Sequence, residues 1–143
     1  MAASTKVVFK VTDVPFIESP DHTMRDSVMV TLETCGSQQY SAGLFFVRPG
    51  TKGHADRHPG QEEVYYIFKG GGQVVIEGEP HRIEAVDVVF IPDGHVHYLV
   101  NDGAEDLGLF WAIAKPWSEL PAIQTELAKW QRVEPGSEWA RAS

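Results

Sequence analysis

Short runs of branched and aromatic residues follow one another along the chain, with turn residues about every ten positions. Such runs are typical of β-strands bounded by glycine, proline, asparagine and aspartate. Strands are therefore predicted at residues 27–34, 44–48, 63–68, 73–77, 82–84, 87–91, 95–100 and 107–114. Many short strands with frequent turns favour an all-β sandwich or barrel over an α/β sheet.

Only the C-terminal part of the chain has a helical pattern. Ser118 is a candidate N-cap, and apolar side chains recur at helical spacing after it: Leu120, Ile123, Leu127 and Trp130. We expect an amphipathic helix over about 118–131 that covers one end of the barrel. Residues 1–26 and 134–143 are expected to be irregular.

Length and charge narrow the class of protein. The 143 residues are enough for one domain with a real core, so residues 1–143 are predicted to be a single domain. A net charge of −8 disfavours nucleic acid and anionic membrane surfaces as partners. The sequence has no apolar run long enough to span a bilayer and no apolar signal segment, and Cys35 is its single cysteine. We therefore expect a cytoplasmic protein.

Metal-ligand residue types are concentrated between residues 50 and 101. Asp56 and His58 are two positions apart, so on a strand both would point to one face, roughly 6.5–7 Å apart. Glu63 begins the next strand after a Pro-Gly turn, and His97 belongs to a third segment. Ligands from separate strands can converge on one ion inside a β-barrel. Asp56, His58, Glu63 and His97 are therefore predicted to form a metal site.

The same window resembles the two motifs of the cupin superfamily. The first motif is Gly, five residues, His-x-His, three or four residues, Glu, six residues and Gly, and its spacing is matched by Gly50, Asp56, His58, Glu63 and Gly70. The second contains Pro-x-Gly, two residues, His, three residues and Asn, matched by Pro92, Gly94, His97 and Asn101. The resemblance implies a double-stranded β-helix, or jelly-roll barrel, over about 27–115. It also implies one divalent metal ion inside the barrel, with Fe, Mn and Zn as candidates.

Two positions depart from the motifs. Val86 stands where the second motif usually begins with glycine, and Asp56 replaces the first histidine of the first motif, which is commonly a ligand. Asp56 could bind the ion directly, or it could be a proton acceptor beside a site made by His58, Glu63 and His97. His54, two residues earlier, is a third candidate ligand or a residue of the rim.

Parity along the strands predicts which side chains line the barrel. Tyr65 and Ile67 share the parity of Glu63, and Leu99 shares that of His97. Neighbouring strands would contribute Phe46 or Arg48, and Phe110 or Trp111. Tyr65 lies next to the predicted metal layer, so it is the candidate for contact with a bound molecule and, with Asp56, a candidate catalytic residue.

The resemblance to cupins implies a metal-dependent enzyme acting on a small, oxygen-rich organic molecule. Dioxygenase chemistry is the first hypothesis, and isomerase, lyase or decarboxylase chemistry is an alternative. A non-catalytic module that binds a sugar or another metabolite is the hypothesis from a different class. Small cupins resemble one another in pairing through strands, and the apolar residues 7–9 could add to a partner's sheet edge. We therefore expect a homodimer.

Overall fold

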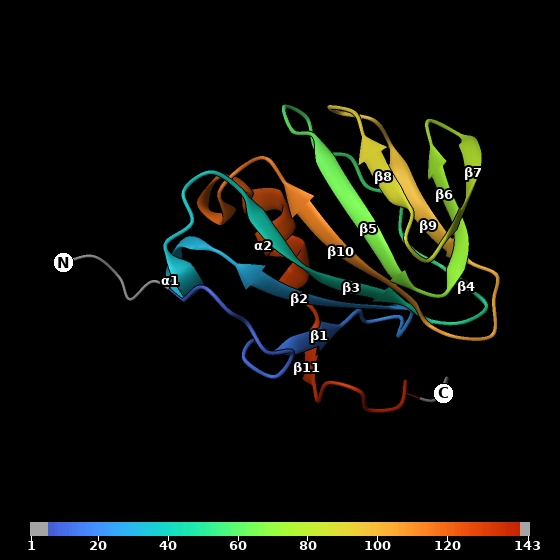
Figure 1. Ribbon diagram of the computed structural model, residues 1–143, viewed down its shortest axis with the longest axis horizontal. Helices are drawn as coiled ribbons and strands as arrows, with labels where there is room; N and C mark the ends of the chain where they lie inside the picture. Colours follow the sequence, from blue (N-terminus) through green and yellow to red (C-terminus); the bar gives the residue numbers. More distant parts are fainter. Residues whose placement is uncertain (1–5, 141–143) are drawn as a thin grey trace.

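The computed structural model describes residues 6–140, and two antiparallel sheets dominate it (Figure 1). The larger sheet has the order β11-β1-β2-β3-β10-β5-β8. Its strands are β1 (Phe16–Glu18), β2 (Met24–Val30), β3 (Ser41–Val47), β5 (Glu63–Lys69), β8 (Val88–Ile91), β10 (Leu107–Ile113) and β11 (Gln131–Val133). The smaller sheet has the order β4-β9-β6-β7, with β4 (Thr51–Lys52), β6 (Gly71–Ile76), β7 (Glu79–Glu84) and β9 (His97–Asn101). The fold is an all-β jelly roll with a C-terminal helix, as predicted.

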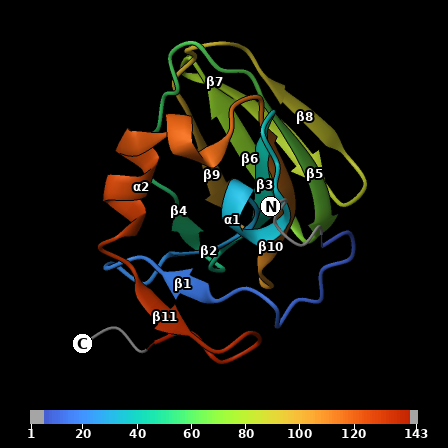
Figure 2. The same cartoon turned by 90° about the vertical axis from the view of Figure 1, so that its left-hand side faces the viewer.

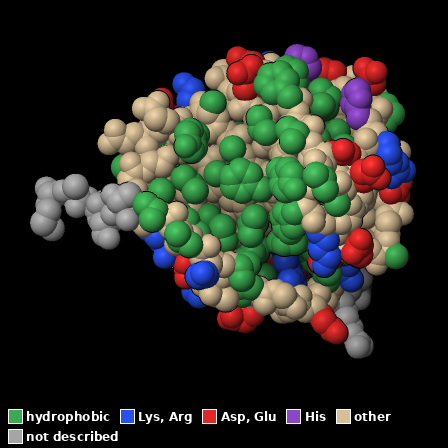
Figure 3. Space-filling model, in the orientation of Figure 1, with side chains coloured by type: hydrophobic (Ala, Val, Ile, Leu, Met, Phe, Trp, Pro, Cys, Tyr) green, Lys and Arg blue, Asp and Glu red, His purple; other side chains and the backbone are tan. Residues whose placement is uncertain are grey.

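The hydrophobic core lies between the two sheets and follows the predicted parity. Tyr65, Ile67 and Leu99 all point inward and are buried. The alternate residues of β5 (Val64, Tyr66 and Phe68) point outward and are each about 40% exposed. In Figure 3 hydrophobic side chains gather over the outer face of the larger sheet. Both faces of this sheet are therefore apolar, although only one of them is buried.

The strand predicted at residues 27–34 is wrong at its end. Strand β2 stops at Val30, and α1 (Leu32–Cys35) follows. The Thr31 hydroxyl accepts a hydrogen bond from the Thr34 N–H at 3.1 Å, and the Thr34 hydroxyl accepts one from the Thr31 N–H at 2.9 Å. This reciprocal cap satisfies N–H groups at the start of a helical turn, so the threonines favour a turn over a strand here.

The prediction of an irregular N-terminal segment is wrong for residues 16–18, which form β1, and for residues 24–26, which begin β2. Residues 1–5 lie outside the described part of the chain. The predicted irregular C-terminal segment has neither helix nor strand over residues 134–140, and residues 141–143 are again outside. Arg25 attaches this tail to β2: its guanidinium donates to the carbonyl oxygens of Ser137 and Glu138 and lies over the Trp139 ring.

The C-terminal helix is shorter than predicted. A single 3₁₀ turn, η1 (Trp117–Glu119), precedes α2 (Pro121–Leu127), and β11 follows. Proline suits the first turn of a helix because its missing N–H would have no partner there, so α2 begins at Pro121 and not after Ser118. Figure 1 and Figure 2 together show α2 at the end of the molecule where α1 and β2 lie, away from β4 and β9. No helix within residues 6–140 has the length and apolar character needed to cross a membrane.

Candidate metal centre and its cavity

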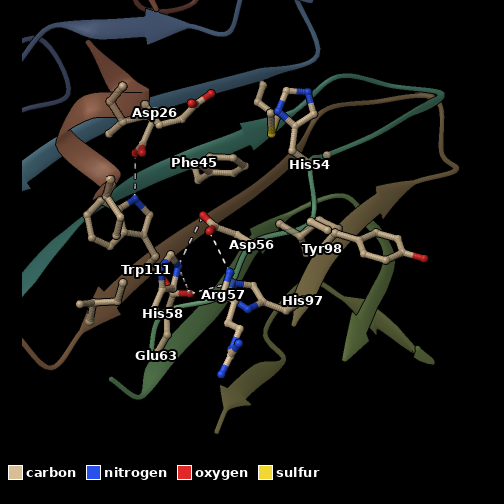
Figure 4. A pocket seen from close by; sticks show the side chains of 18 of the residues that line it. Asp26, Phe45, His54, Asp56, Arg57, His58, Glu63, His97, Tyr98 and Trp111 are labelled. Carbon is tan, nitrogen blue, oxygen red and sulfur yellow. Dashed lines mark hydrogen bonds and ion pairs between the residues drawn. The ribbon is translucent and has the colours of Figure 1, made fainter. Parts of the chain in front are cut away.

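Three side chains from separate segments meet inside the barrel (Figure 4). His58 lies in the loop between β4 and β5, Glu63 is the first residue of β5, and His97 is the first residue of β9. Their potential ligand atoms all lie within 4.8 Å of one another. Glu63 Oε1 is 3.2 Å from His97 Nε2 and 3.8 Å from His58 Nε2. The structure therefore brings together three of the four predicted ligands.

Hydrogen bonds outside the group orient two of these side chains. His97 Nδ1 lies 3.0 Å from the carbonyl oxygen of His95. Because a carbonyl oxygen only accepts, Nδ1 carries the proton and Nε2 faces Glu63. The Tyr65 hydroxyl donates to Glu63 Oε1 at 3.2 Å. Metal ligands in proteins are commonly held in this way, by partners that fix the ring tautomer and the carboxylate rotamer.

The buried carboxylate of Glu63 controls the local electrostatics. Burial, the largest single effect, lowers the pKa of His97. The hydrogen bonds to Glu63 and to the His95 carbonyl and the nearby carboxylates of Glu63 and Asp56 together outweigh it, so the pKa of His97 is raised. Burial and the Glu63 carboxylate both raise the pKa of Tyr65 well above its usual value, so Tyr65 remains a hydrogen-bond donor. A site that attracts positive charge and offers two imidazole nitrogens and one carboxylate fits a divalent cation such as Fe, Mn or Zn.

Asp56 lies at the edge of this group. Its backbone exchanges two hydrogen bonds with His97, at 2.8 and 2.9 Å, in a loop and not in a regular strand. Its Oδ2 is 3.6 Å from His58 Nε2, its Oδ1 accepts from the Arg57 N–H, and its side chain is 60% exposed. Asp56 is not one of the three residues whose ligand atoms are mutually close. Its two predicted roles, ligand and proton acceptor, both stay predictions.

The third candidate ligand, His54, and the motif positions Asn101 and Val86 lie away from the three clustered residues. His54 Nε2 is 2.6 Å from Asp21 Oδ2, so this ring is held at the exposed rim. Asn101 is fully buried, and its amide donates to the carbonyl oxygens of Val47 and Glu105. Val86 has a φ of 80°, in the region that favours glycine, within the turn before β8. Asn101 and Val86 thus contribute to connections between strands and not to the three-residue group.

A cavity of about 500 Å³ adjoins the three residues. Its wall combines charged and polar side chains with aromatic ones, which are Phe45, Tyr65, Tyr98, Trp111, Trp117 and Trp130. Of the predicted alternatives, Trp111 lines the cavity whereas Phe110 points outward and is 41% exposed. Phe45 takes the place expected for Phe46 or Arg48, because Arg48 turns away and donates to the carbonyl oxygen of Ala140. His58, Glu63 and His97, the group of three, therefore open onto a large cavity whose wall is partly aromatic and partly charged.

A family model described as a cupin domain matches residues 43–113. The chain is a cupin-domain protein. The match runs from β3 to β10 and contains all three clustered residues. Strand β2, helix α2 and the residues around them lie outside it, although they also line the cavity. Part of the cavity wall of this cupin therefore comes from segments beyond the matched domain.

Individual proteins show the same relationship. The Oxalate-binding protein of Thermotoga maritima is 37% identical over 59 residues, which are 41% of this chain and 49% of that protein. Polyketide synthase CurC of Streptomyces cyaneus is 28% identical over 100 residues, or 68% of this chain and 65% of that protein. The chain thus matches about half to two thirds of these relatives' length. The polyketide cyclase RemF of Streptomyces resistomycificus has a similar fold, with a TM-score of 0.66 at 18% identity, covering 78% of this chain and 80% of RemF.

Two residues of the cavity wall were not predicted from the sequence. Asp26 fell in a segment predicted to be irregular, because the polar run Arg25-Asp26-Ser27 obscured the start of β2. Asp26 is two and four positions before Val28 and Val30, so on one strand it would point to the same face as these apolar residues, and this spacing could have predicted it. Trp130 was expected on a helix and lies beyond the end of α2, where it lines the cavity of this cupin.

Proposed function

We propose that this cupin is a metal-dependent enzyme that acts on a flat aromatic or polyketide-type molecule with neighbouring oxygen atoms. The reaction we propose is proton transfer at a carbon next to a carbonyl group, the step that precedes ring closure in such molecules. The observation that carries this proposal is the position of a two-imidazole, one-carboxylate group against an aromatic cavity wall.

The residues that would hold the ion are His58, Glu63 and His97, which fit one divalent cation. When bound, such an ion supplies Lewis acidity toward carbonyl oxygens. The protein itself orients the ligand atoms through His95 and Tyr65 and buries Glu63 and His97. These features support a site in which two substrate oxygens face the group of three.

The cavity wall supports the proposed substrate class. Trp111, Trp117 and Trp130 offer ring surfaces against which a flat conjugated molecule can pack. The Trp130 indole N–H is buried with no hydrogen-bond partner among residues 6–140, so an oxygen of the substrate could accept from it. The similarity to proteins named polyketide synthase CurC and polyketide cyclase RemF points in the same direction.

Dioxygenase chemistry is the second candidate. Two histidines and one carboxylate form the ligand set of many non-haem iron oxygenases, so the same group supports it. The two reactions differ in whether oxygen is consumed. Both would use the same three residues. One substrate probe can therefore distinguish them if proton exchange and oxygen uptake are both measured.

Phenylpyruvate is a suitable probe because one methylene group joins its aromatic ring to two neighbouring oxygen-bearing carbons, and this methylene carries the exchangeable protons. We expect it to quench tryptophan fluorescence, since three of the four tryptophans line the cavity. We also expect the metal-loaded protein to exchange the benzylic protons of phenylpyruvate for deuterium, followed by proton NMR. His97→Ala should abolish this exchange, and His81→Ala, a change at an exposed histidine of β7 that does not line the cavity, should retain it.

Three other results would change the assignment. Oxygen uptake by the iron-loaded protein with phenylpyruvate would indicate the dioxygenase. Binding without proton exchange or oxygen uptake would indicate the non-catalytic module. Absence of binding to the metal-loaded protein would contradict the proposed substrate class.

A further inference from the structure

We propose that Asp26 is the proton-transfer residue of the cavity, taking the proton from the substrate carbon and returning it. This inference rests on the proposed function and adds a residue to it. Asp26 belongs to none of the motifs discussed above and lies outside the matched cupin domain.

The position of Asp26 carries the argument. It faces inward from β2, lines the cavity and is only 6% exposed. The Trp111 indole N–H donates to its Oδ1 at 2.9 Å, which fixes the orientation of the carboxyl group (Figure 4). A carboxyl group held in one orientation inside a substrate-sized cavity has the geometry that general acid–base catalysis needs.

The sheet is built to allow this hydrogen bond. Trp111 on β10 pairs with Gly43 on β3, and β3 separates Trp111 from Asp26 on β2. A side chain at position 43 would overlap the Ser27 carbonyl oxygen and approach the Trp111 ring to 3.0 Å. Glycine therefore leaves the space through which the indole of Trp111 reaches across β3 to Asp26.

A purely structural role would not require a carboxyl group. The Trp111 N–H needs one acceptor, and a neutral amide or hydroxyl could supply it without placing an ionisable group in the core. Burying a carboxyl group has a free-energy cost whenever the group is charged. An ionisable acceptor at this position is explained by a need to bind and release a proton.

The surroundings of Asp26 shift its pKa toward the value that proton transfer needs. Burial raises the pKa of Asp26 to about 7, the hydrogen bond from Trp111 opposes this rise, and the Glu63 carboxylate adds to it. General acid–base groups are most effective when their pKa lies near the working pH. Asp26 can therefore hold or release a proton near neutrality.

The other titratable groups on the cavity wall are engaged or more exposed: His54, Asp56, Arg57, His58, Glu63, Tyr65, His97, Tyr98 and Glu126. Glu63 contacts both histidines of the group of three, and Tyr65 donates to Glu63. Asp56 is more than half exposed at the mouth. Among these carboxyl groups, Asp26 is the one that is both buried and outside the group of three.

The proposed step is balanced without any further reactant. The Asp26 carboxylate takes a proton from the carbon next to the carbonyl, and the C–H electron pair forms the carbon–carbon double bond of an enolate. The carbonyl oxygen receives the displaced electron pair. Asp26 then returns this proton, or one that it has exchanged with solvent, to the oxygen, giving the enol, or to the carbon, restoring the ketone.

The first test is Asp26→Asn in the metal-loaded protein. The amide oxygen can still accept from Trp111, but the side chain cannot transfer a proton. We expect benzylic proton exchange of phenylpyruvate to fall roughly 10²–10⁴-fold, with binding by fluorescence retained. Asp102→Asn is the matched control, because Asp102 pairs with Arg82 on the surface away from the cavity. Unchanged exchange in Asp26→Asn, with an active parent protein, would overturn the assignment and leave the proposed function standing.

The second test does not depend on turnover. The indole N–H signal of Trp111, observed by nitrogen–proton NMR, should shift with pH around neutrality and should also respond to phenylpyruvate. In Asp26→Asn the shift around neutrality should disappear, which separates Asp26 from the histidines nearby. If the parent protein is inactive but both responses occur, the proposed function fails while the proton-holding role of Asp26 is supported. A Trp111 signal that responds to neither would overturn the role of Asp26.

Discussion

The Trp111 indole N–H and the Asp26 carboxyl group form a hydrogen bond across β3, inside the barrel. The bond joins a strand of the matched cupin domain to one outside it. It has a consequence for stability because the carboxyl group is buried and the hydrogen bond only partly offsets the cost of ionising it.

Stability should fall as this carboxyl group ionises. Its folded pKa of about 7 is raised above the ordinary value of 3.8, so between these values the folded protein keeps a proton that the unfolded chain releases. The contribution is intact below about pH 4, is lost as the pH rises toward 7, and changes no further above that. We expect Asp26→Asn to be more stable than the parent by up to about 4 kcal/mol at alkaline pH. Urea unfolding of both proteins across this range tests it, and a difference independent of pH would contradict it.

Val86 is a second site where the structure predicts a gain in stability. Its φ of 80° is costly for a branched residue, and its side chain is 72% exposed, so it contributes little packing. We expect Val86→Gly to raise the free energy of unfolding by about 1 kcal/mol, after allowing for the greater freedom of glycine in the unfolded chain. Val88→Gly is the control: Val88 is similarly exposed but lies in β8, and its replacement should destabilise. Equal effects of the two changes would exclude the backbone explanation.

The homodimer stays a prediction, and the outer face of the larger sheet is the surface that we expect it to use. Exposed apolar side chains cover this face: Val64, Tyr66, Phe68, Val88, Phe90 and Phe110. Residues 7–9, which could have added to a partner's sheet edge, have no strand in this structure. We expect sedimentation to give a dimer, Phe90→Asp to shift it toward monomer, and Val11→Asp, outside this face, to leave it unchanged. A monomeric parent protein would contradict this expectation.

Asp56→Ala separates the two roles left open for that residue. Because three other groups already lie together and Asp56 is mostly exposed, we expect the metal content to be retained. A fall in turnover with full metal content would assign Asp56 as a proton acceptor in addition to Asp26. A loss of metal affinity of about tenfold or more would instead assign it as a ligand.

The sequence predicts the strands and the group of three well because both depend on local patterns. Apolar parity places Tyr65, Ile67 and Leu99, and fixed spacings identify the cluster that includes His97. The rest of the site depends on tertiary contacts that spacing does not encode. Asp26 is buried because β2 joins the larger sheet, and it meets Trp111 only because Gly43 leaves room between them.

The central claim is that His58, Glu63 and His97 bind one divalent ion, and elemental analysis of purified His97→Ala tests it most directly. The parent protein should contain about one divalent ion per chain, and His97→Ala should lose most of it, because the two remaining ligands cannot replace an imidazole. Circular dichroism should show that the fold persists, since the core is apolar. His54→Ala, with a histidine that contacts Asp21 at the rim, should retain the ion. A parent protein that binds no divalent ion, or a His97→Ala variant with full metal occupancy, would contradict the account.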